Sequence, residues 1–258
     1  MLLHGLRVLV TRPKPQGEEL CDKIQSLGGK AIYFPVMDIL PPENRDKFKQ
    51  DIASLDQYDI VLFVSRHAVY QSIDTIRALW PEFPQHIQIV AVGQSTARAL
   101  KQVHLPVHDY PMHDWSSEGL LDSPLLQHVQ GKHCAIIRGE TGRNVLADVL
   151  RHRGAHVDNM IAYRRVRSKI DVQPYKHLID AHEIDIIICT SNEILQNLTS
   201  LLAVQSVPLM VISERMLCFA KKLGFKHLYL ANNASHDAIV SELVKREDQL
   251  CQMKKIKT

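Results

Sequence analysis

The chain has 258 residues, of which 45% are hydrophobic and 23% charged, the balance of an ordinary globular protein with about one to two domains. Its 31 basic residues are scattered, and a formal net charge of +3 is too small to favour a nucleic-acid partner. No apolar run approaches the ~18 residues of a membrane span, and the first residues lack a cleavable signal pattern, so we expect a cytoplasmic protein without a membrane partner.

Short β-branched runs alternate with amphipathic patterns along the whole chain. The predicted strands are 6–11, 31–34, 59–64, 87–92, 107–110, 133–137, 156–160, 185–189, 208–212 and 227–230. The predicted helices are 14–27, 43–55, 67–78, 95–104, 116–128, 142–153, 174–182, 192–202, 214–223 and 235–248. Continuous apolar strands separated by amphipathic helices are typical of parallel sheets that are covered on both faces. The sequence therefore predicts an α/β protein with small doubly wound parallel sheets.

The second half of the chain repeats the character of the first half at an offset of 126 positions. The offset relates Gly5 to Gly131, Arg12 to Arg138, Gly28 to Gly154, Asp59 to Asp185 and Ser65 to Ser191. All of these pairs lie at predicted strand–loop–helix junctions, so the chain is predicted to contain two copies of one α/β unit. Clefts between domains are common places for small-molecule sites, and we expect the binding site in such a cleft.

Two extended segments leave the domain boundaries open. FPVMDILPPENR follows the second predicted strand, and MIAYRRVRSKIDVQPY takes the equivalent place in the second copy. Both carry proline just before a new helix, which is typical of a crossing between domains. A plain tandem places a boundary near residue 129. In the alternative, the chain leaves one domain at about 36–42 and returns at about 163–173.

Small polar or basic residues follow several of the predicted strands. In open parallel sheets, ligands bind at the carboxyl ends of strands, where the N–H groups of the next helix favour anions. Helix capping explains a serine or threonine at any one junction. Two junctions, however, carry arginine at positions that the repeat makes equivalent. The candidate substrate-binding residues are Arg12, Ser65, Ser95, Thr96, Arg138, Gly139, Ser191 and Asn192.

The segment IIRGETGRN is the best single candidate for an anion site. Gly139 and Gly142 permit a tight loop, and Arg138 and Arg143 can add charge-assisted hydrogen bonds. Neither a Walker A loop nor GxGxxG occurs, so a nucleotide is not the expected ligand. Tyr163, at the second crossing segment, is either an aromatic packed at a hinge or a neutral phenol that donates a hydrogen bond or a proton.

Cysteine and histidine usage predicts no metal site. The five cysteines are widely spaced and show no CxxC or Cys/His zinc spacing, so we expect reduced structural thiols. The 14 histidines show no ligand pattern, and no GxSxG signature of a serine hydrolase is present.

Taken together, the motifs resemble those of the uroporphyrinogen-III synthases over about residues 5–245. The resemblance lies in the order and spacing of VLVTRPKPQGEELCDKIQSLGGKAIYFPVMDI, DIVLFVSRHAV, VAVGQSTARAL, SSEGLL, IIRGETGRNVLADVLRHRGAHVDNMIAYRRV and ISERMLCFAKKLGF. It implies two flavodoxin-like parallel-sheet domains joined by a two-stranded linker. One domain is expected from 1–35 with 173–258 and the other from 42–162, with linker strands at 36–41 and 163–172.

The resemblance also implies a reaction. A hydro-lyase of this family closes the linear tetrapyrrole hydroxymethylbilane with loss of water and inversion of ring D, giving uroporphyrinogen III without a metal or organic cofactor. Tyr163 matches the cleft tyrosine that is proposed to assist loss of the hydroxyl group. Ser65, Thr96 and Ser191 match cleft hydroxyl positions, and Arg12 and Arg138 match basic positions at strand ends. The turn at Ser213 departs from the family's Gly-x-Thr pattern, so no hydroxyl role is carried over to the residues that follow it.

The expected partners are the tetrapyrrole substrate and, transiently, the preceding enzyme of the pathway, with the chain a monomer. A second reading is a two-domain sensor that binds a small anion without catalysis. A third is a phosphoreceiver-like module, which needs an acidic cluster where this chain has Thr11 and Arg12.

Overall fold

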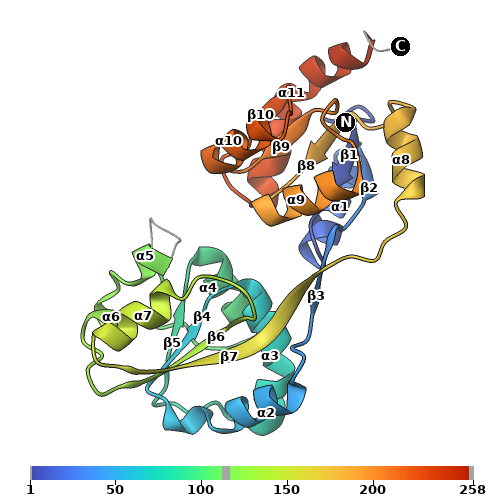
Figure 1. Cartoon of the computed structure of the whole chain (residues 1–258). Helices are drawn as coiled ribbons and strands as arrows, with labels where there is room; N and C mark the ends of the chain where they lie inside the picture. Colours follow the sequence, from blue (N-terminus) through green and yellow to red (C-terminus); the bar gives the residue numbers. More distant parts are fainter. Residues whose placement is uncertain (1, 112–116, 256–258) are drawn as a thin grey trace. The chain divides into compact units, whose positions relative to one another are not determined.

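A computed structural model describes residues 2–111 and 117–255. Contacts divide the chain into two compact units, which are described separately (Figure 1). Unit 1 comprises Met1–Asp38 with Val166–Thr258, and unit 2 comprises Ile39–Arg165. The predicted α/β class with two parallel sheets is confirmed. The finer domain limits and the two-stranded linker stay a prediction.

Unit 1 contains a five-stranded parallel sheet in the order β10-β9-β8-β1-β2. Its strands are β1 (Arg7–Val10), β2 (Lys30–Tyr33), β8 (Ile186–Ile188), β9 (Leu209–Val211) and β10 (Leu228–Leu230). Its helices are α1 (Gln16–Ser26), α8 (Gln173–Asp180), α9 (Asn192–Leu201), α10 (Glu214–Lys222) and α11 (His236–Lys255). Counted within the unit, the strand order is 2-1-3-4-5, the order of flavodoxin-like folds.

Unit 2 contains a second five-stranded sheet in the order β3-β7-β6-β4-β5. Its strands are β3 (Met37–Leu40, which begins in unit 1), β4 (Ile60–Phe63), β5 (Gln88–Ala91), β6 (His133–Gly139) and β7 (His156–Arg167, which ends in unit 1). Its helices are α2 (Arg45–Ala53), the 3₁₀ helix η1 (Leu55–Gln57), α3 (Arg66–Leu79), α4 (Gln94–Gln102), α5 (Ser117–Leu120), α6 (Pro124–Gln127) and α7 (Val145–His152).

The apolar run of β4 shows why this sheet is covered on both faces. All four of its residues are buried, and successive side chains point to opposite faces. Val61 and Phe63 therefore join one core cluster with helix α3, whereas Ile60 and Leu62 join another with helix α7. A strand without alternation of polar residues is what a sheet between two helical layers requires.

Both sheets place strands from the two copies of the repeat side by side. In unit 1, β1 of the first copy pairs with β8 of the second. In unit 2, β4 of the first copy pairs with β6 of the second. In the repeat, strands β2, β1, β8 and β9 of unit 1 correspond to strands β7, β6, β4 and β5 of unit 2. Each set of four lies side by side in that order in its sheet.

Four elements differ from the sequence prediction. Helix α11 continues to Lys255, beyond the predicted end at residue 248. The strand predicted at 107–110 is only an isolated bridge between Val90 and Asp109. The helix predicted at 116–128 is two short helices, because Pro124 occupies the first turn of α6 after Ser123; residue 116 lies outside the described residues. Strand β7 continues to Arg167, so Tyr163 is a strand residue.

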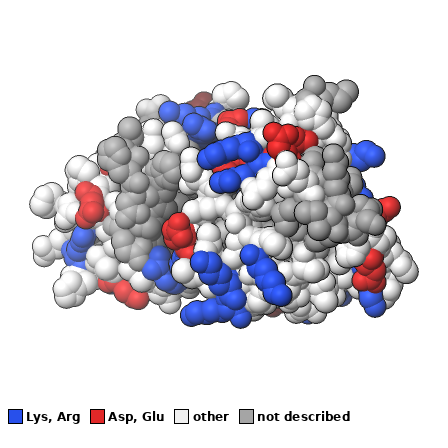
Figure 2. All heavy atoms as spheres, turned by 90° about the horizontal axis from the view of Figure 1, so that it is seen from above, with Lys and Arg blue, Asp and Glu red and all other residues white. Residues whose placement is uncertain are grey.

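Charges of both signs are mixed on the one face of the molecule that Figure 2 draws. There, Lys and Arg side chains are interspersed with Asp and Glu. In the described part of the chain, we find no helix with the length and apolar character needed to span a membrane.

Candidate functional site

A pocket lies at the carboxyl ends of β4 and β6 in unit 2. Its lining residues are Val64, Ser65, Ile136, Arg138, Gly139, Thr141, Gly142, Arg143, Leu146, Tyr163 and Arg165. Three of these described residues are arginines and none is acidic. Strand ends of this kind are where open parallel sheets bind ligands, and the arginines make this pocket suitable for an anion.

Tyr163 places a phenol on the wall of the pocket. The residue is 1% exposed, and its phenol oxygen lies 3.1 Å from Ser65 Oγ and 3.4 Å from Arg165 Nη2. The ring packs against Gly139, where an added Cβ would lie 2.8 Å from ring carbons of Tyr163. Because a Cβ never approaches so closely, only glycine at position 139 leaves room for this ring position.

Ser65 links the start of helix α3 to Tyr163. The serine is the N-cap of α3, and its Oγ accepts a hydrogen bond from the N–H of Ala68 at 3.0 Å. The same hydroxyl contacts Tyr163 Oη. Capping and a site role are therefore compatible at this position, since one hydroxyl oxygen can accept and donate at once.

Arg138 is held in place by the loop that follows β6. It is 7% exposed, its Nη1 donates to Asn144 Oδ1 at 2.8 Å, and its Nε donates to the Gly139 carbonyl at 3.3 Å. Burial lowers the pKa of the Arg138 guanidinium, because a low-dielectric setting disfavours the charged form. A carboxylate bound in the pocket would stabilise the charged form and offset this effect of burial.

The loop itself turns at Gly142, before α7 begins. Gly142 has φ of +139°, a conformation that favours glycine, and a Cβ there would lie 3.1 Å from Arg138 Nη2. The glycine thus permits both the turn and the close approach of the arginine. The predicted tight loop at IIRGETGRN is present, and Arg138, Gly139, Gly142 and Arg143 all line the pocket.

The structure does not bring every predicted residue to this pocket. Ser95 and Thr96 belong to the first turn of α4, whose N-cap is Gly93. Thr96 is 1% exposed, and its N–H donates to the Gly93 carbonyl, whereas Ser95 is exposed. Neither is among the lining residues, so their binding roles stay predictions.

Arg12, Ser191 and Asn192 lie at the carboxyl end of the unit 1 sheet, following the paired strands β1 and β8. Ser191 caps α9 by accepting the N–H of Ile194 at 3.1 Å. Asn192 is the first residue of α9, and its Oδ1 is buried without a hydrogen-bond partner. An unsatisfied acceptor of this kind is uncommon in folded proteins, and it keeps Asn192 a candidate for binding a donor.

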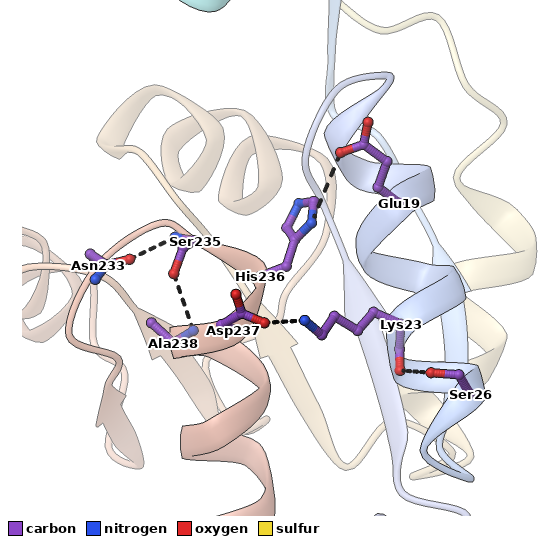
Figure 3. A network of polar contacts seen from close by, with 8 residues as sticks. All are labelled: Glu19, Lys23, Ser26, Asn233, Ser235, His236, Asp237 and Ala238. Atoms are coloured by element: carbon purple, nitrogen blue, oxygen red, sulfur yellow. Dashed lines mark hydrogen bonds and ion pairs between the residues drawn. The ribbon is translucent and has the colours of Figure 1, made fainter. Parts of the chain in front are cut away.

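Arg12 is 3% exposed, and its Nη1 donates to the Ala234 carbonyl at 3.0 Å. Figure 3 shows how the segment around Ala234 is attached to α1. His236 lies 3.9 Å from Glu19, Lys23 pairs with Asp237, and Ser235 accepts the N–H of Ala238 at 3.2 Å. The carbonyl that Arg12 contacts therefore lies just before α11, next to residues that are paired with α1.

Arg165 was not identified from the sequence. Side chains at positions 163 and 165 lie on the same face of a strand, because the side-chain period is two residues. The two-residue spacing of Tyr163 and Arg165 is visible in IAYRRV. It indicates a shared face only if the segment is a strand, and the predicted strand ended at residue 160. Within the described residues, no group of three or more His, Cys, Asp or Glu side chains is arranged to hold a metal ion.

Comparisons with known proteins point to one family. A family model described as uroporphyrinogen-III synthase HemD matches residues 18–241. The uroporphyrinogen-III synthase of Escherichia coli (strain K12) is 33% identical over 248 residues, which cover 92% of this chain and 100% of that protein. The uroporphyrinogen-III synthase of Salmonella typhimurium is 32% identical over 248 residues, with the same coverage of 92% and 100%.

Solved structures share the fold. A mutant uroporphyrinogen III synthase from the extremely thermophilic bacterium Thermus thermophilus matches with a TM-score of 0.61 at 20% identity, over 95% of this chain and 99% of that chain. Uroporphyrinogen-III synthetase from Helicobacter pylori 26695 matches with a TM-score of 0.58 at 14% identity, over 93% of this chain and 98% of that chain. At these identities the similarity concerns the fold alone.

Proposed function

Because the chain belongs to the uroporphyrinogen-III synthase family, we propose that it closes hydroxymethylbilane to uroporphyrinogen III with loss of water and inversion of ring D. This hydro-lyase step belongs to tetrapyrrole (haem) biosynthesis. The family model and the full-length relatives support the assignment. The alternative of a sensor without catalysis is not favoured, because these relatives are named as synthases.

One observation in this chain carries the proposal. Tyr163, a residue that is 1% exposed, borders a pocket with three arginines and no acidic residue among its described lining. Such a pocket suits a substrate that carries carboxylates and loses a hydroxyl group. We propose that Arg138 and Arg143 bind substrate carboxylates and that Tyr163 acts on the hydroxymethyl group.

The first chemical step breaks the C–O bond of that hydroxymethyl group. The electron pair leaves with the oxygen, to which the Tyr163 O–H donates a hydrogen bond, and the hydroxide takes up a proton to depart as water. The pyrrole nitrogen supplies the electrons of the new exocyclic double bond and loses its own proton, which gives an azafulvene. Attack by the last ring then forms a spirocyclic pyrrolenine, whose rearrangement inverts ring D.

The pocket contributes mainly by holding the substrate in one geometry. Hydroxymethylbilane is reactive and cyclises unaided to the type I isomer. The enzyme must therefore favour one attack over another, and fixed carboxylate contacts do this by limiting the orientations of the reacting ends. Three further points stay predictions. They are the binding of carboxylates by Arg12, Ser191 and Asn192, the monomeric state, and the transient contact with the preceding enzyme.

An isomer assay tests the function. Purified protein is incubated with hydroxymethylbilane, and the products are oxidised and separated by chromatography. We expect the type III isomer to predominate, against the type I isomer in a protein-free control. If the protein leaves the type I isomer as the only product, the proposed activity is wrong. A sensor would bind the substrate and leave the isomer ratio of the control unchanged.

A further inference from the structure

Arg165 follows Tyr163 on the same face of β7 and contacts its phenol. Arg165 Nη2 lies 3.4 Å from Tyr163 Oη, and the guanidinium carbon lies 5.9 Å from the centroid of the tyrosine ring. Both residues line the pocket. We propose that Arg165 is a positioning residue, which acts with Ser65 to direct the Tyr163 O–H towards the substrate. The inference rests on the proposed function.

The hydrogen-bonding capacities of the three groups support this role. A guanidinium only donates, so Arg165 must donate to the phenol oxygen. Ser65 Oγ already accepts from the N–H of Ala68, and its own proton can be donated to Tyr163 Oη. Two donors then occupy both lone pairs of the phenol oxygen. The phenol proton is left to point away from Ser65 and Arg165, where a leaving hydroxyl group can accept it.

A second arrangement competes with this one. The phenol can instead donate its proton to Ser65 Oγ at 3.1 Å, because the serine oxygen still has a lone pair, and Oη can then still accept from Arg165. In that arrangement the tyrosine proton is not available to the substrate. The positive charge of Arg165 favours the first arrangement, because a cation attracts the lone pairs of the phenol oxygen and repels its proton, which then points away from the guanidinium.

The nearby residues restrict where the phenol can go. Gly139 lies under the ring, with an added Cβ 2.8 Å from ring carbons, and the His67 ring centroid lies 5.9 Å from the Tyr163 centroid. The ring is therefore held by packing, and the direction of the O–H is the remaining freedom. This is the freedom that the donors from Arg165 and Ser65 decide.

A different role for Arg165 would be a direct contact with a substrate carboxylate. The two roles differ in their dependence on the tyrosine hydroxyl. A positioning residue has nothing to position in Tyr163→Phe, whereas a carboxylate contact remains useful there. The variants are therefore Arg165→Met and Arg165→Lys, each in the wild-type and Tyr163→Phe backgrounds. Arg167→Met is the matched control, since Arg167 is an exposed arginine on the same face of β7.

Steady-state kinetics give the first readout. We expect Arg165→Met to lower kcat about tenfold with KM little changed, as for loss of one charge-assisted hydrogen bond. Arg165→Lys should recover part of the loss, and Arg167→Met should stay within about twofold of wild type. In the Tyr163→Phe background, Arg165→Met should cause no further loss. An equal loss in both backgrounds, or a change confined to KM, overturns the proposal.

A second readout does not depend on activity. Protein labelled with 3-fluorotyrosine gives a fluorine resonance for each tyrosine. The resonance that is missing in the spectrum of Tyr163→Phe is assigned to Tyr163. We expect Arg165→Met to shift this resonance and Arg167→Met to leave it in place. An unmoved resonance in Arg165→Met refutes the contact even if the isomer assay supports the synthase activity. If the resonance shifts in Arg165→Met but the isomer assay gives only the type I product, the synthase activity is refuted and the contact between Arg165 and Tyr163 is supported.

Discussion

Asp185 accepts a hydrogen bond from the backbone N–H of Arg7 at 2.8 Å, although 178 positions separate them in the chain. Unit 2 repeats the arrangement at the equivalent positions, where Asp59 accepts the N–H of His133 at 2.8 Å. In both units the aspartate N–H also donates to the carbonyl of the same partner at 2.9 Å. The offset of the sequence repeat is therefore a structural equivalence, with an aspartate joining two central strands in each sheet.

The pair in unit 1 is predicted to matter for stability. The Arg7 guanidinium donates to Asp185 at 2.7 and 3.1 Å, and the hydrogen bond to Asp185 is the main reason that the pKa of Arg7 is raised. The Asp185 side chain is only 5% exposed. We expect Asp185→Ala to lower the free energy of unfolding by about 3 kcal/mol, measured by urea denaturation. The Arg7 guanidinium then loses its carboxylate partner and keeps, within the described part of the chain, only the hydrogen bond to the His182 carbonyl at 2.7 Å.

Asp148→Ala is the control for that substitution. Asp148 and Arg151 are exposed and 3.8 Å apart, so we expect a change below about 0.5 kcal/mol. Equal effects of the two substitutions would contradict a special role for the buried pair.

Buried thiols predict a loss of stability at alkaline pH. Burial raises the pKa of Cys134 to about 11 and that of Cys189 to about 12. In the unfolded chain a thiol titrates near ~8.5, so the unfolded state loses protons first and stability falls as pH rises above that value. The contribution is fully present below pH ~8.5 and declines by about 1.4 kcal/mol per pH unit for each thiol until the folded pKa is reached.

Cys134→Ala separates this effect from packing. In urea denaturation with reductant at pH 7, 9 and 10, the stability lost between pH 9 and pH 10 should be smaller than in wild type by about 1.4 kcal/mol. The difference at pH 7 reports only the loss of packing at the substituted position. Parallel curves for the two proteins would show that the thiol does not titrate as expected.

Tyr163→Phe should slow the reaction while leaving the fold intact. Removal of the phenol oxygen deletes the contact with Ser65 but keeps the ring that packs on Gly139. We expect kcat for the type III product to fall about 100-fold, as when a proton donor is lost, and the circular dichroism spectrum to be unchanged. An unaltered kcat would mean that positioning of the substrate alone carries the catalysis.

Gly139→Ala should displace the phenol without removing it. The new methyl group would lie 2.8 Å from Tyr163 ring carbons, so the ring must move. We expect at least a tenfold loss of kcat, because small displacements at a site have large effects on rate. The double variant with Tyr163→Phe should lose little more than Tyr163→Phe alone. Strictly additive losses would indicate that Gly139 acts independently of the tyrosine.

Ser191→Ala and Ser213→Ala form a matched pair in unit 1. Both serines cap a helix, with Oγ accepting an N–H from Ile194 at 3.1 Å and from Met216 at 3.3 Å. Each substitution should therefore lower the free energy of unfolding by about 1 kcal/mol. If Ser191 also binds the substrate, only Ser191→Ala raises KM. Identical KM values would assign Ser191 to capping alone.

Much of the fold was predictable because its signals are local. The apolar run of β4 and the amphipathic pattern of α3 are contained in their own residues, and both elements occur within two residues of the predicted limits. The failures have local causes as well. Pro124 divides the helix that was predicted at 116–128, and the segment at 107–110 forms only one bridge.

The site was predictable only in part, because its contacts join distant segments. Ser65, Arg138, Gly139 and Tyr163 line one pocket as part of the predicted set, whereas Thr96 does not. Ser65 and Thr96 both lie at the start of a helix, and the sequence does not distinguish the hydroxyl group that lines the pocket from the one that does not. The direction in which each strand end faces depends on packing, and sequence spacing carries no information about it.

The sequence by itself determined the α/β class, the repeat and the presence of small or basic residues at strand ends, since each depends on short-range pattern and spacing. The tertiary structure decided that β1 pairs with β8 and β4 with β6, and that Ser65 meets Tyr163 across 98 positions. It also revealed Arg165 beside the phenol. These relationships arise from strand register and long-range burial, which minimise the exposed apolar surface of the whole unit and are not specified by any single segment.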